Sequence, residues 1–332
     1  MAAPPLILLS LALLLHTALP LEVHFYRSSC PRAEVIAKRV LEERFRKEPS
    51  IAAALLRLFF HDCFIRGCDG SVLLDSTDDN IAEKEAPPNL TLRGFDVIDD
   101  IKAALENECR GTVSCADVLA MAARDASALS GGAAYPLPMG RRDGLVSLMS
   151  EAHLPGPSFT IFQAIDAFRG INLTVVDLIT LLGAHSVGLC HCGFFVDRLY
   201  NFKGTSMPDP SMDPGLLATL KQKCPNVVVT VQNISKDPTV FMNQASATPF
   251  KLDSSFFRGV LGKKAVLNLD QQLAFADLSS ALAAKYLSRP KVFIRKFSKS
   301  MVKLGNVGVL TGNQGEIRLN CRRTNNNTSS SD

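Results

Sequence analysis

The sequence predicts a single large domain that is mainly α-helical. Several stretches place apolar residues three and four positions apart, which is the spacing of one helix face. Capping residues precede some of these stretches, and segments rich in Pro and Gly separate them. Alternating strand patterns are scarce, and no internal repeat or linker divides the chain. With 332 residues, the chain is long enough to bury a sizeable core.

The expected helices follow from this periodicity, and they cover residues 33–47, 51–60, 95–109, 115–130 and 276–287. Two start signals resemble capping boxes: Ser114 with Asp117, and Thr174 with Asp177. The second begins a helix at 174–182, and Gly183 is expected to end it. Breaks are expected at 86–89, 131–132 and 154–157. Residues 227–231 are a short strand candidate, although a buried loop would give the same pattern.

The two ends of the chain differ from its body. Residues 1–20 are expected to be a signal peptide cleaved between 18 and 21, because the apolar run 6–15 is shorter than the roughly 20 residues that span a bilayer. No Lys or Arg precedes that run. The domain is expected over 21–323, followed by a polar, disordered tail at 324–332. We therefore expect a secreted protein of the cell wall or extracellular space, with the vacuole as an alternative, and no membrane association.

Charge and cysteine content agree with secretion. The net charge is only +4 and the basic residues are scattered, which argues against nucleic-acid binding. Nine cysteines favour an oxidising compartment and leave one without a partner, but their spacing does not fix the pairing. The possible glycosylation acceptors are Asn89, Asn172, Asn233, Asn326 and Asn327.

The first candidate for chemistry is the pair Arg57 and His61. Four residues separate them, so a helix projects both from one face, beside Phe60. Their apolar surroundings make an unpaired buried charge costly. On these residues alone, a structural hydrogen-bond network is favoured over a catalytic site.

The loop after this helix is rich in oxygen ligands. Asp62, Asp69 and Ser71 supply side chains, and the carbonyl groups of Ile65 and Gly67 are further candidates. Hard oxygen ligands of this kind suit Ca²⁺. A turn with solvated acidic residues is the alternative.

Longer motifs around these residues resemble those of the class III plant secretory haem peroxidases. The similarity extends in the family's order over nearly the whole mature chain and ends at Cys321. The matching runs are RLFFHDCFIRGCDGS (57–71), LRGFDVID (92–99), VSCAD (113–117), AARD (122–125), GRRD (140–143) and LLGAHS (181–186). The resemblance implies a haem peroxidase fold of about ten helices in two lobes, with haem b between them.

The resemblance assigns roles to the residues around His61. His61 matches the base that takes a proton from peroxide and returns it to the leaving hydroxyl, and Arg57 the cation that stabilises the developing negative charge. Phe60 matches an apolar wall. Asn89 matches the asparagine that accepts a hydrogen bond from the histidine, and Glu83 the acid that supports it. If Asn89 points into the site, it cannot carry a glycan.

A second histidine gains its role only from the resemblance. From the residues alone, His185 is a helix-end histidine that could lie in the core or partner the helix dipole. In the family, the matching histidine is the axial haem ligand, and Asp270 matches the carboxylate that accepts its other N–H. A zinc site formed by Cys190, His191 and Cys192 with His185 is a less favourable alternative, because three consecutive residues do not converge easily on one ion.

Further assignments also follow from the resemblance. Pro155 matches a residue whose carbonyl binds small phenols. A second calcium site would use Ser186, Thr248 and Asp253, but Ala245 replaces a carboxylate that this site normally has. Tyr135 and Phe59 replace a common Trp and His. The implied disulfides are Cys30–Cys109, Cys63–Cys68, Cys115–Cys321 and Cys192–Cys224, which leaves Cys190 free.

The expected function is that of a monomeric haem peroxidase. It would reduce hydrogen peroxide and oxidise small phenolic donors in two one-electron steps. The alternative is a catalytically silent structural or binding protein on the same scaffold. The presence of Arg57, His61, Asn89, His185 and Asp270 argues against that alternative.

Overall fold

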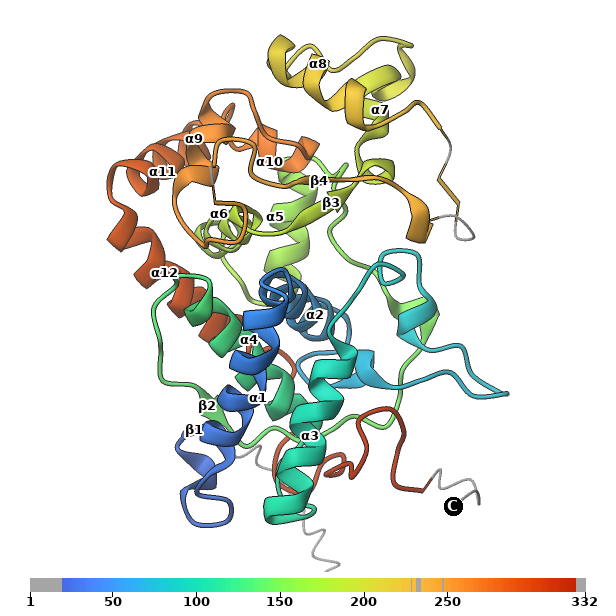
Figure 1. Cartoon of the computed structure of the whole chain (residues 1–332), viewed down its shortest axis with the longest axis vertical. Helices are drawn as coiled ribbons and strands as arrows, with labels where there is room; N and C mark the ends of the chain where they lie inside the picture. Colours follow the sequence, from blue (N-terminus) through green and yellow to red (C-terminus); the bar gives the residue numbers. More distant parts are fainter. Residues whose placement is uncertain (1–19, 228, 231–233, 247, 327–332) are drawn as a thin grey trace, which may run out of the picture.

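The computed structural model describes residues 20–227, 229–230, 234–246 and 248–326, and it is mainly helical (Figure 1). The α-helices are α1 (Ala33–Lys47), α2 (Ile51–Ile65), α3 (Phe95–Cys109), α4 (Cys115–Leu129), α5 (Ile161–Gly170), α6 (Val175–Leu182), α7 (Val196–Tyr200), α8 (Pro214–Lys223), α9 (Ser255–Leu261), α10 (Asn268–Gln272), α11 (Asp277–Ser288) and α12 (Pro290–Leu304). The predicted fold class is therefore confirmed.

The helices form two groups (Figure 1). In the first group, α2 packs against α4, and α1 packs against α3 and α4. In the second group, α11 packs against α9, and α12 packs against α6 and α11. Figure 1 shows α12 running from the second group down to the first, so it joins the two. A smaller apolar cluster surrounds α7 and α8.

Periodicity predicted the bounds of several helices closely, whereas no bounds were predicted for α5, α7, α8, α9, α10 and α12. The ranges 33–47 and 95–109 are confirmed, and the predicted helix 115–130 ends one residue earlier, at Leu129. The predicted helix 51–60 was too short, since α2 continues to Ile65. Its last turn contains His61, Asp62 and Cys63, which are all buried, so the polar residues there do not end the helix.

Strands are few and very short. β1 (Glu22–Val23) pairs antiparallel with β2 (Pro138–Met139), with Glu22 opposite Met139. β3 (Leu189–His191) pairs antiparallel with β4 (Thr239–Phe241), with Cys190 opposite Val240. The described residues of the strand candidate 227–231 form no strand, and positions 228 and 231 lie outside the described residues.

Of the two predicted capping boxes, the one at α6 is confirmed and the one at α4 is only half formed. Thr174 and Asp177 form a complete capping box at α6. The Ser114 side chain accepts a hydrogen bond from the Asp117 backbone N–H, but the Asp117 carboxylate binds Arg141 and Tyr26 instead of completing the box.

Gly183 ends α6, as predicted, but not in the left-handed conformation that is common at helix ends. Its φ is −59°, and the chain continues as a 3₁₀ turn, η5 (Gly183–Ser186), which contains His185. A Cβ atom at Gly183 would overlap the Phe293 ring, so close packing against α12 requires the glycine.

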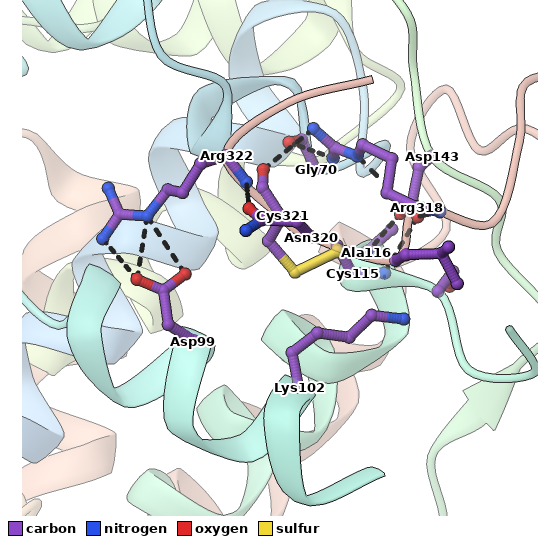
Figure 2. The surroundings of a disulfide bond; sticks show 12 residues. Gly70, Asp99, Lys102, Cys115, Ala116, Asp143, Arg318, Asn320, Cys321 and Arg322 are labelled. Carbon is purple, nitrogen blue, oxygen red and sulfur yellow. Dashed lines mark hydrogen bonds and ion pairs between the residues drawn. A yellow bond between two sulfur atoms is a disulfide. The ribbon is translucent and has the colours of Figure 1, made fainter. Parts of the chain in front are cut away.

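Four disulfides are present, and they are the same four pairs that the resemblance implies: Cys30–Cys109, Cys63–Cys68, Cys115–Cys321 and Cys192–Cys224. Cys190 is free and buried. Cys115–Cys321 fastens the C-terminal segment to the start of α4, as Figure 2 shows.

The buried carboxylate of Asp143 organises this region (Figure 2). It accepts backbone hydrogen bonds from Cys115 at 3.0 Å, from Ala116 at 2.8 Å and from Arg318 at 2.8 Å. The Arg318 side chain, fully buried, donates to the Gly70 carbonyl at 2.6 Å. One carboxylate therefore connects α4, the C-terminal segment and the loop that follows α2.

Residues 1–19 and 327–332, at the two ends of the chain, lie outside the residues that the structure describes. The predicted signal peptide falls almost entirely within residues 1–19, and most of the predicted tail falls within 327–332. Among the described helices, none is by itself long and apolar enough to cross a membrane, although α5 and the α6–η5 segment meet these criteria when combined across a 112° bend.

Asp143→Asn should destabilise the protein by about 3–5 kcal/mol, because it leaves the buried Arg318 cation without its carboxylate and turns an amide toward N–H donors. Asp99→Asn is the matched control, since Asp99 pairs with Arg322 at a partly exposed site and should lose about 1 kcal/mol or less. Urea unfolding with the disulfides intact measures both. Equal losses would contradict the role given to Asp143.

Candidate active site

His61, which lies on α2 and is itself buried, is held in one tautomer by Asn89. Its Nδ1 lies 2.6 Å from Oδ1 of Asn89. The Asn89 Nδ2 donates to the backbone carbonyl of Glu83 at 2.6 Å, so the amide oxygen is the atom that faces the ring. His61 therefore carries its proton on Nδ1, and Nε2 has a free lone pair.

The group of Glu83 that binds Asn89 is not the side-chain acid that the resemblance implies. It is the main-chain oxygen of Glu83, in the 3₁₀ turn η3 (Glu83–Glu85), and not the Glu83 carboxylate. Both carboxylate oxygens of Glu83 are buried without a hydrogen-bond partner in the described structure. The carboxyl group instead lies beside Ser71 and Asp69.

Arg57 lies one turn before His61 and carries an uncompensated charge. Its guanidinium donates to Thr91 Oγ1 at 2.9 Å and to the Pro88 carbonyl at 2.7 Å. None of the ion pairs in the described chain includes Arg57. Burial lowers the pKa of Arg57 to about 10, which still leaves the group charged at neutral pH. Neutral oxygens thus fix the cation in place without cancelling its charge.

Burial first, and the adjacent charge of Arg57 second, lower the pKa of His61 to about 3, whereas the hydrogen bond with Asn89 acts in the opposite direction. His61 is therefore neutral throughout the physiological range. Its ring meets Phe60 edge-on at 5.9 Å, and Phe60 stacks on Phe168 at 6.3 Å between ring centres.

His185 has an analogous arrangement with a charged partner. Its Nδ1 lies 2.9 Å from both carboxylate oxygens of Asp270, which is buried in α10. A carboxylate only accepts, so Nδ1 donates and Nε2 keeps its lone pair. The side chain of His185 is 31% exposed, and its Nε2 has no hydrogen-bond partner among the described residues.

Two contacts connect the surroundings of the two histidines, and a third holds the Pro155 loop beside α10. A Cβ atom at Gly188, whose φ is +97°, would overlap Ala53 on α2. The buried Cys190 thiol interacts electrostatically with both Arg57 and Asp270, and burial raises its pKa to about 12, so the thiol is neutral. Pro157, two residues after Pro155, accepts a hydrogen bond from Leu269 beside Asp270. Pro155 itself is half-buried in this loop.

Each histidine belongs to a face that protein atoms cover incompletely. On α2, most of whose residues are buried, the side chains of Ala53, Ala54, Arg57 and Phe60 are only half-buried, and they share one helix face. Near His185, Leu182 and Ala184 are also half-buried. These apolar faces and free Nε2 atoms fit a flat apolar group with a metal at its centre, such as haem.

A buried acidic cluster lies at the end of α2. Asp62, Asp69 and Glu83 are 0%, 5% and 0% exposed. Burial raises the pKa of Asp62 and of Asp69, the Asp69 charge further raises that of Asp62, and burial raises the pKa of Glu83 to about 8. The buried Ser71 hydroxyl has no partner in the described structure. Gly67, whose carbonyl was a predicted ligand, has a φ of +111° and touches Gly308.

These groups suit a hard cation, because a divalent ion would offset the buried charge and occupy the free oxygens. No three His, Cys, Asp or Glu residues in the described ranges are arranged as a metal site, so neutral oxygens would have to complete the ligand set, as the sequence predicts with Ile65 and Gly67.

The polar groups of the predicted second calcium site have hydrogen-bond partners within the protein. The Asp253 carboxylate accepts from the backbone and the hydroxyl of Ser255, and the Asp253 N–H donates to Ser186 Oγ at 3.2 Å. The exposed Thr248 hydroxyl contacts Ser246 at 3.1 Å. With Ala245 in place of a carboxylate, this arrangement does not fit a calcium ion well.

Two further expectations are resolved. The zinc alternative is wrong, because Cys192 forms a disulfide with Cys224. Asn89 is 2% exposed and both ends of its amide are hydrogen-bonded, so the fold leaves no room for a glycan there. Asn172 is exposed, whereas Asn233 and Asn327 lie outside the described residues.

Sequence reasoning missed the contributions of Pro88 and Thr91. Their signal was weak, since both flank Asn89 and carry no distinctive motif. It also missed the position of Cys190 between Arg57 and Asp270, which depends on the strand β3 folding back toward α2.

The chain is similar in sequence to known peroxidases. A family model described as Peroxidase matches residues 37–289. Peroxidase 57 of Arabidopsis thaliana is 45% identical over 305 residues, covering 92% of this chain and 93% of that protein. Peroxidase 28 of the same plant is 44% identical with coverage of 92% and 93%. Peroxidase 5 of Vitis vinifera is 44% identical over 319 residues, with 95% of each chain covered.

The lowered pKa of His61 predicts a pH dependence of stability. Between the ordinary value of 6.5 and about 3, the unfolded chain holds a proton on His61 that the folded chain does not. The free energy of unfolding should therefore fall with falling pH, by up to roughly 1.4 kcal/mol per pH unit from this residue. His61→Leu removes this titration, so its stability should fall less steeply. Urea unfolding of the wild type and of His61→Leu between about pH 3 and 6.5 measures both free energies of unfolding. If the two free energies fell equally steeply with pH, His61 would take up its proton in the folded protein, and the prediction would be wrong.

Proposed function

The chain belongs to the peroxidase family, within its plant class III group, and we propose that His185 holds the haem while His61 and Arg57 act on hydrogen peroxide at the opposite face. One observation carries the proposal. Two histidines in the same region are each bonded through Nδ1, one to a neutral amide and the other to a carboxylate, so each presents a free Nε2.

The two partners suit two different roles. The Asp270 carboxylate increases the electron density on the His185 ring, which favours metal ligation and stabilises oxidised iron. The neutral Asn89 amide leaves His61 an uncharged base, and the nearby Arg57 cation disfavours its protonation at rest. We therefore assign ligation to His185 and proton transfer to His61.

When bound, haem would supply the two electrons that cleavage of the peroxide O–O bond consumes. Two donor molecules would then return one electron each. Nε2 of His61 takes the proton from one peroxide oxygen and delivers it to the other, which leaves as water. Asn89 keeps the ring in the required tautomer and orientation throughout. Arg57, free of any carboxylate in the described structure, stabilises the negative charge that develops as the O–O bond breaks.

We further propose that the donors are small phenols that bind near the Pro155 loop. The hydrogen bond between Pro157 and Leu269 supports this placement, because it holds that loop beside α10, which carries Asp270. Phe60 would limit access to the metal on the His61 side, supported by its stacking on Phe168. Secretion of the protein as a monomer, with the four disulfides formed, is part of the same proposal.

We also propose one calcium ion per chain, bound by Asp62, Asp69 and Ser71 with the Ile65 and Gly67 carbonyl groups. The buried acids and the free Ser71 hydroxyl support this site. The mutual hydrogen bonds of Asp253, Ser255 and Ser186 argue against a second ion.

His61→Leu should retain the haem Soret band but slow the reaction with peroxide by about 10²–10⁴-fold, because proton transfer is lost. His185→Ala should instead lose haem or change the iron coordination seen in the spectrum. His24→Asn, at an exposed position with a positive φ that Asn tolerates, is the control and should change neither. Stopped-flow kinetics and oxidation of a simple phenol provide the readouts. Unchanged peroxide kinetics in His61→Leu would remove His61 from its role.

Metal analysis of the purified protein should find one calcium per chain. Asp62→Asn should lose it, since a ligand charge is removed, whereas Asp253→Asn should keep it. Chelation should lower the midpoint of thermal unfolding in the wild type and have little further effect in Asp62→Asn. A count of two, or a count unaffected by Asp62→Asn, would contradict the proposed site.

A further inference from the structure

A groove of about 1020 Å³ lies away from both histidines, between α12 and the segment that follows α4. Figure 1 shows that segment, in green, looping past α12 on its way to β2. Residues 131 and 133–136 form one wall, residues 251–254 contribute to the groove, and α12 forms the opposite wall. None of its lining residues has a role in the proposed peroxidase reaction.

The wall formed by α12 consists of two adjacent rows with a spacing of four residues. Ile294, Ser298 and Val302 form a mostly apolar row at the floor. Lys291, Arg295 and Lys299 form a cationic row beside it, and Lys303 continues that row. Across the groove, the exposed Ala133, Ala134 and Pro136, with half-buried Tyr135, form an apolar wall.

Three members of the cationic row form no ion pair in the described chain, although Asp253 also lines the groove. Lys303 pairs with Asp177 at 2.8 Å, but no ion pair in the described chain involves Lys291, Arg295 or Lys299. Like charges four residues apart destabilise a helix, and Lys291 lies in the first turn, where a cation opposes the helix dipole. The cationic row therefore lowers the stability of α12 in the protein alone, and its charge is complementary to an anion with several charges.

The spacing of the row indicates the shape of that anion. Four residues of α-helix advance about 6 Å. In an extended peptide, every second side chain points to the same side and advances about 6.6–6.8 Å. Long Lys and Arg side chains can absorb the small difference per step. The side chains between them point the opposite way, toward the wall of Ala133–Ala134–Tyr135–Pro136.

We propose that this groove binds an extended segment of a partner protein in which acidic residues alternate with apolar ones. The acidic side chains meet Lys291, Arg295 and Lys299, and the apolar side chains pack against residues 133–136 and the floor of the groove. The site recruits the enzyme to a partner and leaves the peroxidase reaction unchanged.

The test uses the haem-loaded full chain and a dye-labelled Asp-Leu-Asp-Leu-Asp-Leu-Asp peptide, with binding followed by fluorescence anisotropy. A Leu-Leu-Leu-Asp-Asp-Asp-Asp peptide has the same composition and charge without the alternation. We expect the alternating peptide to bind clearly tighter, with an affinity that decreases as salt increases. Equal affinity for the two peptides would overturn the proposal, since the groove would then select charge alone.

Two variants with the same change in net charge locate the site. Lys291→Glu/Arg295→Glu/Lys299→Glu reverses the row and should weaken binding by about tenfold or more. Arg39→Glu/Arg46→Glu/Lys47→Glu reverses three cations of α1 that form no ion pair in the described structure, and it should bind nearly as the wild type does. Equal weakening by both variants would overturn the proposal.

The apolar floor and the chemistry of the anion are tested separately. Ile294→Ser/Val302→Ser keeps every charge and should also weaken binding of the alternating peptide, because the apolar floor is lost. If the triple variant folds poorly, Arg295→Gln replaces it, and a normal Soret band with unchanged phenol oxidation confirms an intact enzyme. Polygalacturonate is the competing probe. If it binds through the cationic row while the alternating peptide does not, the site takes an acidic polysaccharide and the peptide proposal is wrong.

Discussion

The structure depends on a buried carboxylate, Asp143, that receives three backbone N–H groups from segments far apart in the sequence. A buried carboxylate is costly unless donors surround it, so its neighbours can adopt few other arrangements. Through Cys115 and Ala116 it sets the start of α4, and through Arg318 it holds the loop after α2 at Gly70. Because α2 carries Arg57 and His61, the placement of the proposed active site depends in part on a carboxylate that contacts neither residue.

The two histidines differ in the group that binds their Nδ1 atoms. Each ring is fixed through Nδ1, and the partner decides the chemistry at Nε2. A carboxylate partner suits the ligand role that we propose for His185, whereas an amide partner suits the role of neutral base that we propose for His61, beside a cation. Glu83 connects this machinery to the proposed calcium site, since its backbone carbonyl orients Asn89 while its carboxyl group lies beside Ser71 and Asp69. A change in the metal site can therefore reach His61 through one residue.

Local sequence predicted much of the fold and part of the site. Helix periodicity and capping residues act over a few positions, so they predicted the bounds of α1 and α3 and the start of α6. The pairing of Arg57 with His61 on one face also follows from helix geometry alone. The end of α2 was missed, because burial of Asp62 and Cys63 overrode their polarity. His185 and Asp270, 85 positions apart, were linked by resemblance and not by any local pattern.

The sequence by itself therefore determined the helical class, the bounds of several helices and the shared face of Arg57 and His61, because these depend on contacts within a few turns of the chain. Only the tertiary structure decided which atom of Glu83 supports Asn89, that Pro88 and Thr91 hold Arg57, and that Gly183 is required by the Phe293 ring. It also decided that Asp253 bonds to Ser255, and that the cations of α12 line a groove. These features depend on how separate segments pack together, and residue spacing along the chain carries no direct record of that packing.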